Sequence, residues 1–329
     1  MRPPGFWYRP PASPGLLPRL LAPISLAVAA ATRRRVARTG QRAGVPVICA
    51  GNINTGGAGK TPAVIALLQH LAARGVKAHA LSRGYGGRES GPLRVDPSAH
   101  GAGDVGDEPL LIAAFAPCWV SRDRAAGAQA AIRGGAQALV LDDGFQNPAL
   151  EKDIPILVID AGQGFGNGRV VPAGPLREPV AAGLARAGLV LTIGSQEERA
   201  RVHADWPELS AIPEMTGRLE PLRTGMDWRR TRLFAFAGIG RPEKFFATLR
   251  ALGADVAGTR ALADHAPLSP RLMKRLDSEA RAMSAQLVTT EKDSVRLPKG
   301  WNSRVLTLPV RLAVADWSAL DRKLDELGL

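Results

Sequence analysis

Residues 51–62 read GNINTGGAGKTP and lie between an apolar run, VPVICA (45–50), and a segment of helical length, 61–73. Glycines in such a loop let backbone N–H groups turn toward phosphate oxygens without a Cβ clash. A helix that begins where the loop ends adds partial positive charge at the same place. The stretch therefore predicts a strand, a phosphate-binding loop and a helix in succession. The residues expected to form the nucleotide site are Asn54, Thr55, Gly56, Gly57, Ala58, Gly59, Lys60, Thr61 and Pro62.

Two side chains of this loop carry chemistry of their own. Lys60 is placed to reach the β- and γ-phosphates of a nucleotide, and Thr61 to offer its hydroxyl to Mg²⁺. The general pattern has glycine where this chain has Asn54, so the loop is a variant. The alternative is a glycine-rich turn followed by a chance Lys-Thr pair. The flanking strand and helix make that alternative the weaker interpretation.

The rest of the chain alternates short apolar runs with helix-length segments, which is typical of a parallel sheet covered on both faces. We therefore expect an α/β fold with a doubly wound, mainly parallel sheet and a second, smaller α/β domain. A turn-rich stretch at 213–227 separates the two patterns. The expected division is an N-terminal segment at 1–44, a P-loop domain at 45–225 and a smaller domain at 226–329. Further strands are expected at 77–81, 137–143, 154–160, 188–194, 233–240 and 286–290, and further helices at 241–252 and 316–327.

The N-terminal segment is basic and partly apolar. Residues 1–42 contain eight arginines and no acidic residue, in a chain of formal net charge +13. The uncharged run 20–31 is 12 residues long, short of the roughly 20 that a membrane-spanning helix needs. Its apolar residues recur at helical spacing and arginines follow, which favours a helix lying on a membrane surface. An ordinary packed helix and a secretory signal peptide remain open as alternatives.

Composition indicates a folded protein of a reducing compartment. The chain has 329 residues, of which 45% are hydrophobic and 22% charged, as in globular domains. Two cysteines, Cys49 and Cys118, cannot form a disulfide framework and are expected to be buried thiols. The basic excess points to an anionic surface, either membrane headgroups or nucleic acid. A plainer interpretation is that an arginine-rich composition only raises the isoelectric point.

Two acidic pairs are candidates for serving a metal ion. QALVLDDGFQ (137–146) ends an apolar strand in Asp142 and Asp143, where a Walker B acid would lie beside a P-loop. Side chains alternate along a strand, so we expect the two carboxylates to have different roles; a solvated turn is the alternative. GDEP (106–109) begins a helix, where Asp107 is either a cap or a base for an attacking hydroxyl, with Glu108 near the metal. Spacing alone favours the cap.

Taken together, the motifs resemble one family, tetraacyldisaccharide 4′-kinase, the lipid A kinase of Gram-negative bacteria. The matching strings extend from the N-terminal apolar segment to about residue 297 and run in family order. They are GNINTGGAGKTP, LSRGYGG, GDEP, SRDR, DDGFQN, FGNGRVVPAGPLREP, FAGIGRPEKFF, ADH and TTEKDSVRL. The chain departs from the family at Asn147, where His is usual, and at Ala266, where a second His commonly follows His265.

The resemblance implies transfer of the γ-phosphate of ATP to the 4′-hydroxyl of a tetraacylated glucosamine disaccharide 1-phosphate, giving lipid IV-A. It implies ATP and Mg²⁺ as cofactors and a peripheral position at lipids of the cytoplasmic face of the bacterial inner membrane. We expect neither nucleic acid nor an obligate protein partner.

The resemblance also assigns roles to residues. Lys60 binds the phosphates, and Asp107 acts as general base with the help of His265, a residue that alone is more typical of a structural histidine. The residues implied to serve Mg²⁺ are Thr61, Glu108, Asp142 and Asp143. The residues implied to face substrate or phosphate are Arg122, Arg124, Arg177 and Glu178.

Two other functions fit parts of the sequence. A P-loop ATPase that binds nucleic acid or a partner protein would suit the variant loop and the basic N-terminus, but it does not need the PAGPLREP string or an Asp-His string in a second domain. A kinase for a soluble sugar would use the N-terminal helix only for packing.

Overall fold

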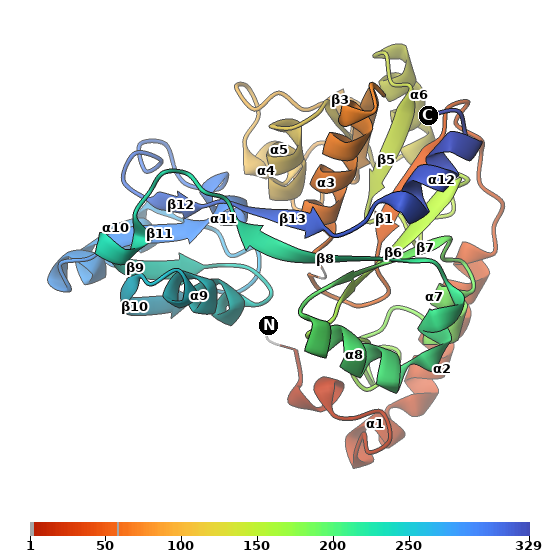
Figure 1. Ribbon diagram of the computed structural model, residues 1–329, viewed down its shortest axis with the longest axis horizontal. Helices are drawn as coiled ribbons and strands as arrows, with labels where there is room; N and C mark the ends of the chain where they lie inside the picture. The colour runs from red at the N-terminus through yellow and green to blue at the C-terminus, as the bar shows by residue number, and fades with distance from the viewer. Residues whose placement is uncertain (1–2, 58) are drawn as a thin grey trace.

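The computed structural model describes residues 3–57 and 59–329, so Ala58 of the expected nucleotide site lies outside the described residues. The chain forms two bodies, each built on its own sheet, and the two sheets are joined by a long two-stranded ribbon (Figure 1). The expected α/β class with a mainly parallel sheet is confirmed.

The described residues of the larger body form a nine-stranded sheet in the order β13-β8-β7-β6-β1-β5-β2-β4-β3. Its inner strands pair in parallel, whereas the two edge pairs, β3 with β4 and β8 with β13, are antiparallel. The bounds are β1 Val47–Gly51, β2 Ala78–Ser82, β3 Leu93–Arg94, β4 Cys118–Val120, β5 Ala138–Asp142, β6 Ile154–Asp160, β7 Leu189–Ile193, β8 Glu214–Pro221 and β13 Val310–Val314. The strands expected at 45–50, 77–81, 137–143, 154–160 and 188–194 are thus confirmed to within two residues.

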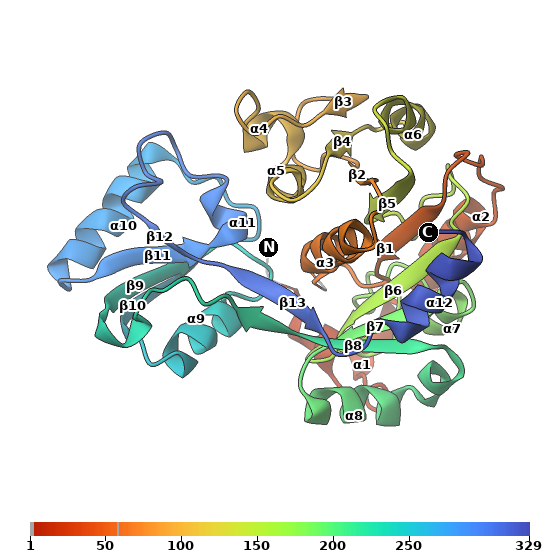
Figure 2. The same cartoon turned by 45° about the horizontal axis from the view of Figure 1, so that its top comes forward.

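Helices cover both faces of this sheet (Figure 2). The phosphate-loop helix α3 (Lys60–Ala73) is buried on nearly every side, which fits a central helix of the core. Its apolar side chains, including Leu67 and Leu71, share one core cluster with Ile48 of β1 and Leu320 of the C-terminal helix. The other helices are α1 Leu16–Leu20, α2 Ala22–Val36, α4 Ala102–Val105, α5 Asp107–Ala113, α6 Arg124–Arg133, α7 Val180–Leu184, α8 Gln196–Asp205 and α12 Ser318–Glu326, with short 3₁₀ turns at Gly5–Tyr8 and Pro207–Ala211.

The smaller body holds a parallel four-stranded sheet in the order β10-β9-β11-β12. Its elements are β9 Arg232–Ala237, α9 Pro242–Ala251, β10 Asp255–Ala261, α10 Pro270–Ala282, β11 Gln286–Thr290, α11 Glu291–Ser294 and β12 Leu306–Leu308, preceded by a 3₁₀ turn at Trp228–Arg230. It meets the larger body through ion pairs, for example where Asp160 at the end of β6 accepts from Arg241 at 2.9 Å and Lys244 at 2.8 Å.

The expected end of the smaller domain, residue 329, is wrong. After β12 the chain turns back, and β13 pairs antiparallel with β8 over Val310↔Pro221 to Val314↔Gly217. The C-terminal helix α12 then packs its buried Leu320 and Leu324 into the core of the larger body. Residues 310–329 therefore belong with the P-loop body. Without β13, β8 would be an open edge strand with unpaired backbone groups.

The N-terminal helices α1 and α2 lie along one side of the larger body (Figure 1). Trp7 donates its indole N–H to the carbonyl of Pro172, and the hydroxyl of the buried Ser25 accepts from the amide of Ala173. Apolar side chains on the other side of the helices stay exposed: Leu16 71%, Leu20 67% and Leu26 71%. The segment thus packs on the body with one face and leaves an apolar face uncovered. Among the described residues, no helix is long and apolar enough to cross a membrane.

Candidate active site

The phosphate loop joins β1 to α3 at the carboxyl edge of the large sheet. Gly56 and Gly59 have φ of 124° and 79°, in the left-handed region that glycine adopts without strain. Two hydrogen bonds fix the loop to other segments of the larger body. The amide of Thr55 donates to the carbonyl of Pro175 at 2.7 Å, and the Asn54 side chain donates to the carbonyl of Gly164 at 3.0 Å. The asparagine that replaces glycine in the general pattern therefore anchors the loop.

Lys60 is the first residue of α3 and is nearly buried. Its Nζ lies 3.2 Å from Oδ1 of Asn52 and 3.6 Å from Oδ2 of Asp143. Arg177 in turn binds Asp143 through two contacts, at 2.8 and 3.1 Å. Burial opposes ionisation of Asp143, but the charges of Lys60 and Arg177 outweigh it and hold the pKa of this carboxyl below its usual value. Two cations are thus arranged around one carboxylate beside the phosphate loop.

Asp142 is the last residue of β5 and has a different environment, whereas Asp143 follows the strand with a left-handed φ of 50°. Its Oδ2 accepts from the hydroxyl of Ser82 at 3.1 Å, while its Oδ1 is buried and has no hydrogen-bond partner among the described residues. Burial, together with the nearby charges of Glu108 and Asp143, raises the pKa of Asp142 to about 7. A cation at this place would relieve the cost of keeping the carboxylate ionised.

These residues fit Mg²⁺ in the way a phosphate-transfer site holds it. The described residues contain no group of three or more His, Cys, Asp or Glu side chains that could hold a metal alone. Mg²⁺ usually takes one or two carboxylates and completes its shell with water and substrate phosphates. The unpartnered Oδ1 of Asp142 suits that role, and Thr61 lies in the first turn of the adjacent helix α3.

Asp107 and His265 come from different bodies and meet. Nδ1 of His265 lies 3.0 Å from Oδ2 of Asp107, while Oδ1 of Asp107 accepts from the amide of Glu108 at 3.0 Å. The hydrogen bond that His265 donates to Asp107 raises the pKa of His265, against burial and the charge of Lys292. Burial opposes ionisation of Asp107, but His265 and Lys292 outweigh it and its pKa is lowered. Gly106 is the N-cap of α5, so Asp107 is not the cap residue itself, although it binds an amide of the first turn.

Lys292, at the start of α11, is a cation that the sequence interpretation missed. Its Nζ lies 3.1 Å from Oε1 of Glu108, 3.2 Å from Nε2 of His265 and 3.8 Å from Oδ1 of Asp264. Burial would lower the pKa of Lys292, but the carboxylates of Glu108, Asp107 and Asp264 outweigh it and the pKa is raised. In the sequence, Lys292 lies in an EKD run that looks like a solvated charged stretch. The signal that could have identified this lysine is that the run belongs to the TTEKDSVRL string.

One cavity of about 750 Å³ collects most of these groups. The predicted site residues that line it are Thr55, Gly56, Gly57, Lys60, Glu108, Arg122, Arg124, Asp142, Asp143, Arg177 and His265. The predicted site residues that the structure describes but that do not line this cavity are Asn54, Gly59, Thr61, Pro62, Asp107 and Glu178. Lining residues that were not predicted are Arg35, Ser82, Arg83, Tyr85, Gln146, Asn147, Pro148, Asp264 and Lys292.

Two of the residues expected to face substrate are buried and make contacts within the larger body, although Arg124 also lines the main cavity. Arg124 is 3% exposed and donates to the backbone carbonyls of Leu81 and Asp142, so its guanidinium fixes two strand ends. Glu178 is 2% exposed, pairs with Arg186 and borders a separate cavity of about 210 Å³ beside α2. Arg122 is exposed and lines the main cavity.

Fold and site together define a P-loop kinase: a phosphate loop with its lysine and two strand-end carboxylates shares one cavity with the histidine of an Asp–His pair. A family model for tetraacyldisaccharide-1-P 4′-kinase matches residues 17–328. The chain belongs to this family.

Individual relatives agree with that membership. The chain is 60% identical to a tetraacyldisaccharide 4′-kinase of Dinoroseobacter shibae, over 99% of this chain and 98% of the relative. It is 56% identical to one of a Jannaschia species, over 99% of each. Among solved structures it is similar to the "apo" form of LpxK from Aquifex aeolicus in complex with ATP, with a TM-score of 0.76 and 24% identity, over 95% of this chain and 99% of that one.

Proposed function

We propose that this chain transfers the γ-phosphate of ATP to the 4′-hydroxyl of a tetraacylated glucosamine disaccharide 1-phosphate, giving lipid IV-A. The observation that carries the proposal is that Lys60, Asp143 and His265 line the same cavity. Phosphoryl transfer requires mainly positioning and neutralisation of charge, and a basic group for the attacking hydroxyl.

The phosphate donor is proposed to bind at the loop. Backbone amides of residues 55–57 and 59 and the ammonium of Lys60 would receive the β- and γ-phosphates. Thr61, Glu108, Asp142 and Asp143 would hold Mg²⁺, which supplies charge neutralisation of the phosphate oxygens when bound. Arg177, kept in place by Asp143 and Gln146, lies where it can contact a phosphate at the same edge of the cavity.

The acceptor is proposed to lose its proton to the Asp107–His265 pair. Of the two, His265 lines the cavity, whereas Asp107 is 4% exposed and holds the ring through its Nδ1. A positioned base of this kind typically contributes about 10²–10⁴-fold to the rate. Arg122 at the rim would face the acceptor, and Arg124 and Glu178 would act only by supporting the residues around them.

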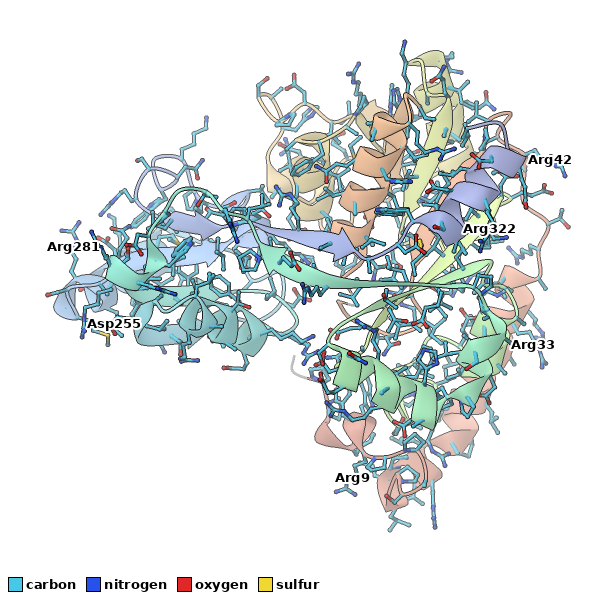
Figure 3. All side chains as sticks on the ribbon, in the orientation of Figure 1. Arg9, Arg33, Arg42, Asp255, Arg281 and Arg322 are labelled. Carbon is cyan, nitrogen blue, oxygen red and sulfur yellow. The ribbon has the colours of Figure 1, made fainter. Side chains whose placement is uncertain are left out.

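The exposed apolar face of α1 and α2 is proposed to rest on the cytoplasmic face of the inner membrane. Leu20 and Leu26 are 67% and 71% exposed, and arginines such as Arg9 and Arg33 extend from the same segment (Figure 3). Apolar side chains beside cationic ones are typical of helices that bind anionic lipid surfaces. Arg35 of α2 also lines the main cavity, so the same segment reaches from the proposed lipid surface to the site.

The reaction is tested by incubating the protein with γ-labelled ATP, Mg²⁺ and the tetraacyl disaccharide 1-phosphate in detergent. Label at the 4′ position of the lipid supports the proposal. ATP hydrolysis with an unlabelled lipid would contradict the acceptor and favour a switch ATPase or another hydroxyl substrate.

The membrane position is tested separately by flotation with vesicles that contain anionic lipid. Leu20→Glu and Leu26→Glu should reduce vesicle binding, because each places a charge on the apolar face. Leu219→Glu is the matched control, since Leu219 is 42% exposed on the distant strand β8. Equal binding by all three variants and the wild type would contradict the proposed surface.

A further inference from the structure

Lys292 reaches into the site from the smaller body and contacts groups from both bodies. Its Nζ lies 3.2 Å from Nε2 of His265 in its own body and 3.1 Å from Oε1 of Glu108 in the larger one. Its side chain is 21% exposed and lines the cavity. It is therefore a mostly buried cation in direct contact with the histidine that faces the acceptor.

The contact with His265 defines which ring nitrogen carries the proton. A lysine ammonium has only donors, so Nε2 of His265 must accept. The ring proton then lies on Nδ1 and points at Oδ2 of Asp107, 3.0 Å away. A charged ring would set two N–H donors facing each other at 3.2 Å, so Lys292 opposes the charged ring that Asp107 and Asp264 favour. The one ring atom able to take a proton from a hydroxyl is thus covered by Lys292.

Lys292 lines the same cavity as Gly56, Gly57 and Lys60 of the phosphate loop. Its neighbour Asp264, 3.8 Å away, adjoins Gly240 of the smaller body. A Cβ placed on Gly240 would be 3.8 Å from Oδ2 of Asp264 and 3.7 Å from the backbone nitrogen of Gly57 in the phosphate loop. The ammonium is carried on a flexible four-carbon stem, and phosphate oxygens form strong charge-assisted hydrogen bonds with it.

We propose that Lys292 is a further catalytic residue: it covers Nε2 of His265 until the phosphates of the nucleotide enter, and it then moves its hydrogen bonds to those phosphates. This inference rests on the proposed function, because it takes a nucleotide as the phosphate donor. Nε2 becomes free only when the donor is bound. The hydroxyl proton of the acceptor then passes to Nε2 as the acceptor oxygen bonds to the γ-phosphorus and the bond from that phosphorus to the β,γ-bridging oxygen breaks, with ADP as the leaving group. The same move brings one more positive charge to the group in transfer.

The first test follows the imidazole nitrogens of His265 by ¹⁵N NMR in the full-length protein. The chain has 5 histidines, and a His265→Gln variant assigns the signal. In the wild type without nucleotide, Nε2 should have the shift of a hydrogen-bonded acceptor. At a pH above the pKa of the ring, which Asp107 raises, Lys292→Met, or a non-hydrolysable ATP analogue added to the wild type, should move it toward that of a free acceptor. An Nε2 signal that neither change moves would overturn the proposal.

The second test is kinetic and separates catalysis from the joining of the two bodies. Lys292→Met should lower kcat on the order of 10²-fold, with little change in the KM for the acceptor. Lys244→Met is the matched control, because Lys244 also bridges the bodies, through Asp160, but does not line the cavity. Equal kcat for the two variants would overturn the catalytic role.

The two readouts also distinguish this inference from the proposed function. If the analogue shifts the Nε2 signal but no label reaches the lipid, the acceptor is wrong and the role of Lys292 stands. If label reaches the lipid but the analogue leaves the signal unchanged, the proposed function stands and the role of Lys292 is refuted.

Discussion

Glu178 has two possible roles, which a substitution can distinguish: contact with the substrate, or support of the residues around the site. The structure favours the second role. Its carboxylate is 2% exposed, pairs with Arg186 at 2.6 and 2.5 Å and accepts from Gln146 at 2.9 Å. Gln146 also donates to the carbonyl of Asn52 at 2.8 Å and accepts from Arg177 at 3.1 Å. Glu178→Gln would keep the shape of the side chain and remove its charge, leaving Arg186 without its counter-ion.

The expected cost follows from burial. Breaking a fully buried ion pair typically costs about 3–5 kcal/mol. Arg186 keeps 29% of its side chain exposed, so water compensates in part and we expect about 2–3 kcal/mol. For a body of this size that corresponds to a fall in Tm of roughly 5–10 °C.

The measurement is thermal unfolding of Glu178→Gln together with its kinetics well below the unfolding temperature. Exposed Glu208, replaced by Gln, is the control for loss of one carboxylate charge. Tm should fall for Glu178→Gln only, while the KM for the acceptor stays near the wild-type value. A Tm equal to that of the control, combined with a raised KM for the acceptor, would refute the reasoning and return Glu178 to the substrate-facing set.

Three further outcomes are expected. Lys60→Ala should lower kcat on the order of 10²–10³-fold because the phosphates lose a positioned charge; near-normal turnover would contradict the phosphate loop. Asp107→Asn should lower kcat by roughly 10²–10⁴-fold and leave the KM for ATP almost unchanged, whereas an effect on ATP alone would assign Asp107 to the metal. Burial raises the pKa of Cys49 to about 11 and also raises that of Cys118, so the thiolate forms only at strongly alkaline pH. A thiol reagent should therefore label neither in the native protein at neutral pH and both in denaturant, and fast native labelling would contradict their burial.

Local features of the site could be predicted from the sequence, because each is written in a short segment. The strand, the glycine loop and the helix that carries Lys60 lie within one continuous stretch, and hydrophobic pattern and glycine chemistry specify all three. Asp142 and Asp143 likewise follow from their place at a strand end. Their different environments come from the turn after the strand, because Asp143 follows β5 with a left-handed φ of 50°.

Features that depend on distant contacts could not be derived in this way. Asp107 and His265 are 158 residues apart, and only the resemblance to a family brought them together. Nothing in the sequence near Arg124 or Glu178 tells whether a charged side chain faces a cavity or a buried partner. The strand pattern at 310–314 does not say which strand β13 pairs with. It therefore could not predict that β13 returns to the large sheet and pairs with β8.

The antiparallel ribbon of β8 and β13 gives the smaller body the topology of an insert. The chain leaves the larger body after Pro221 and returns to it at Val310. These two residues are paired with each other in the register of β8 and β13. A short hairpin loop between them would close the large sheet without the insert. The P-loop body could then be produced alone, with Lys60 and Asp142 but without His265 and Lys292. Such a shortened protein would keep the residues for nucleotide binding and lack residues for phosphoryl transfer, so the two steps could be studied separately.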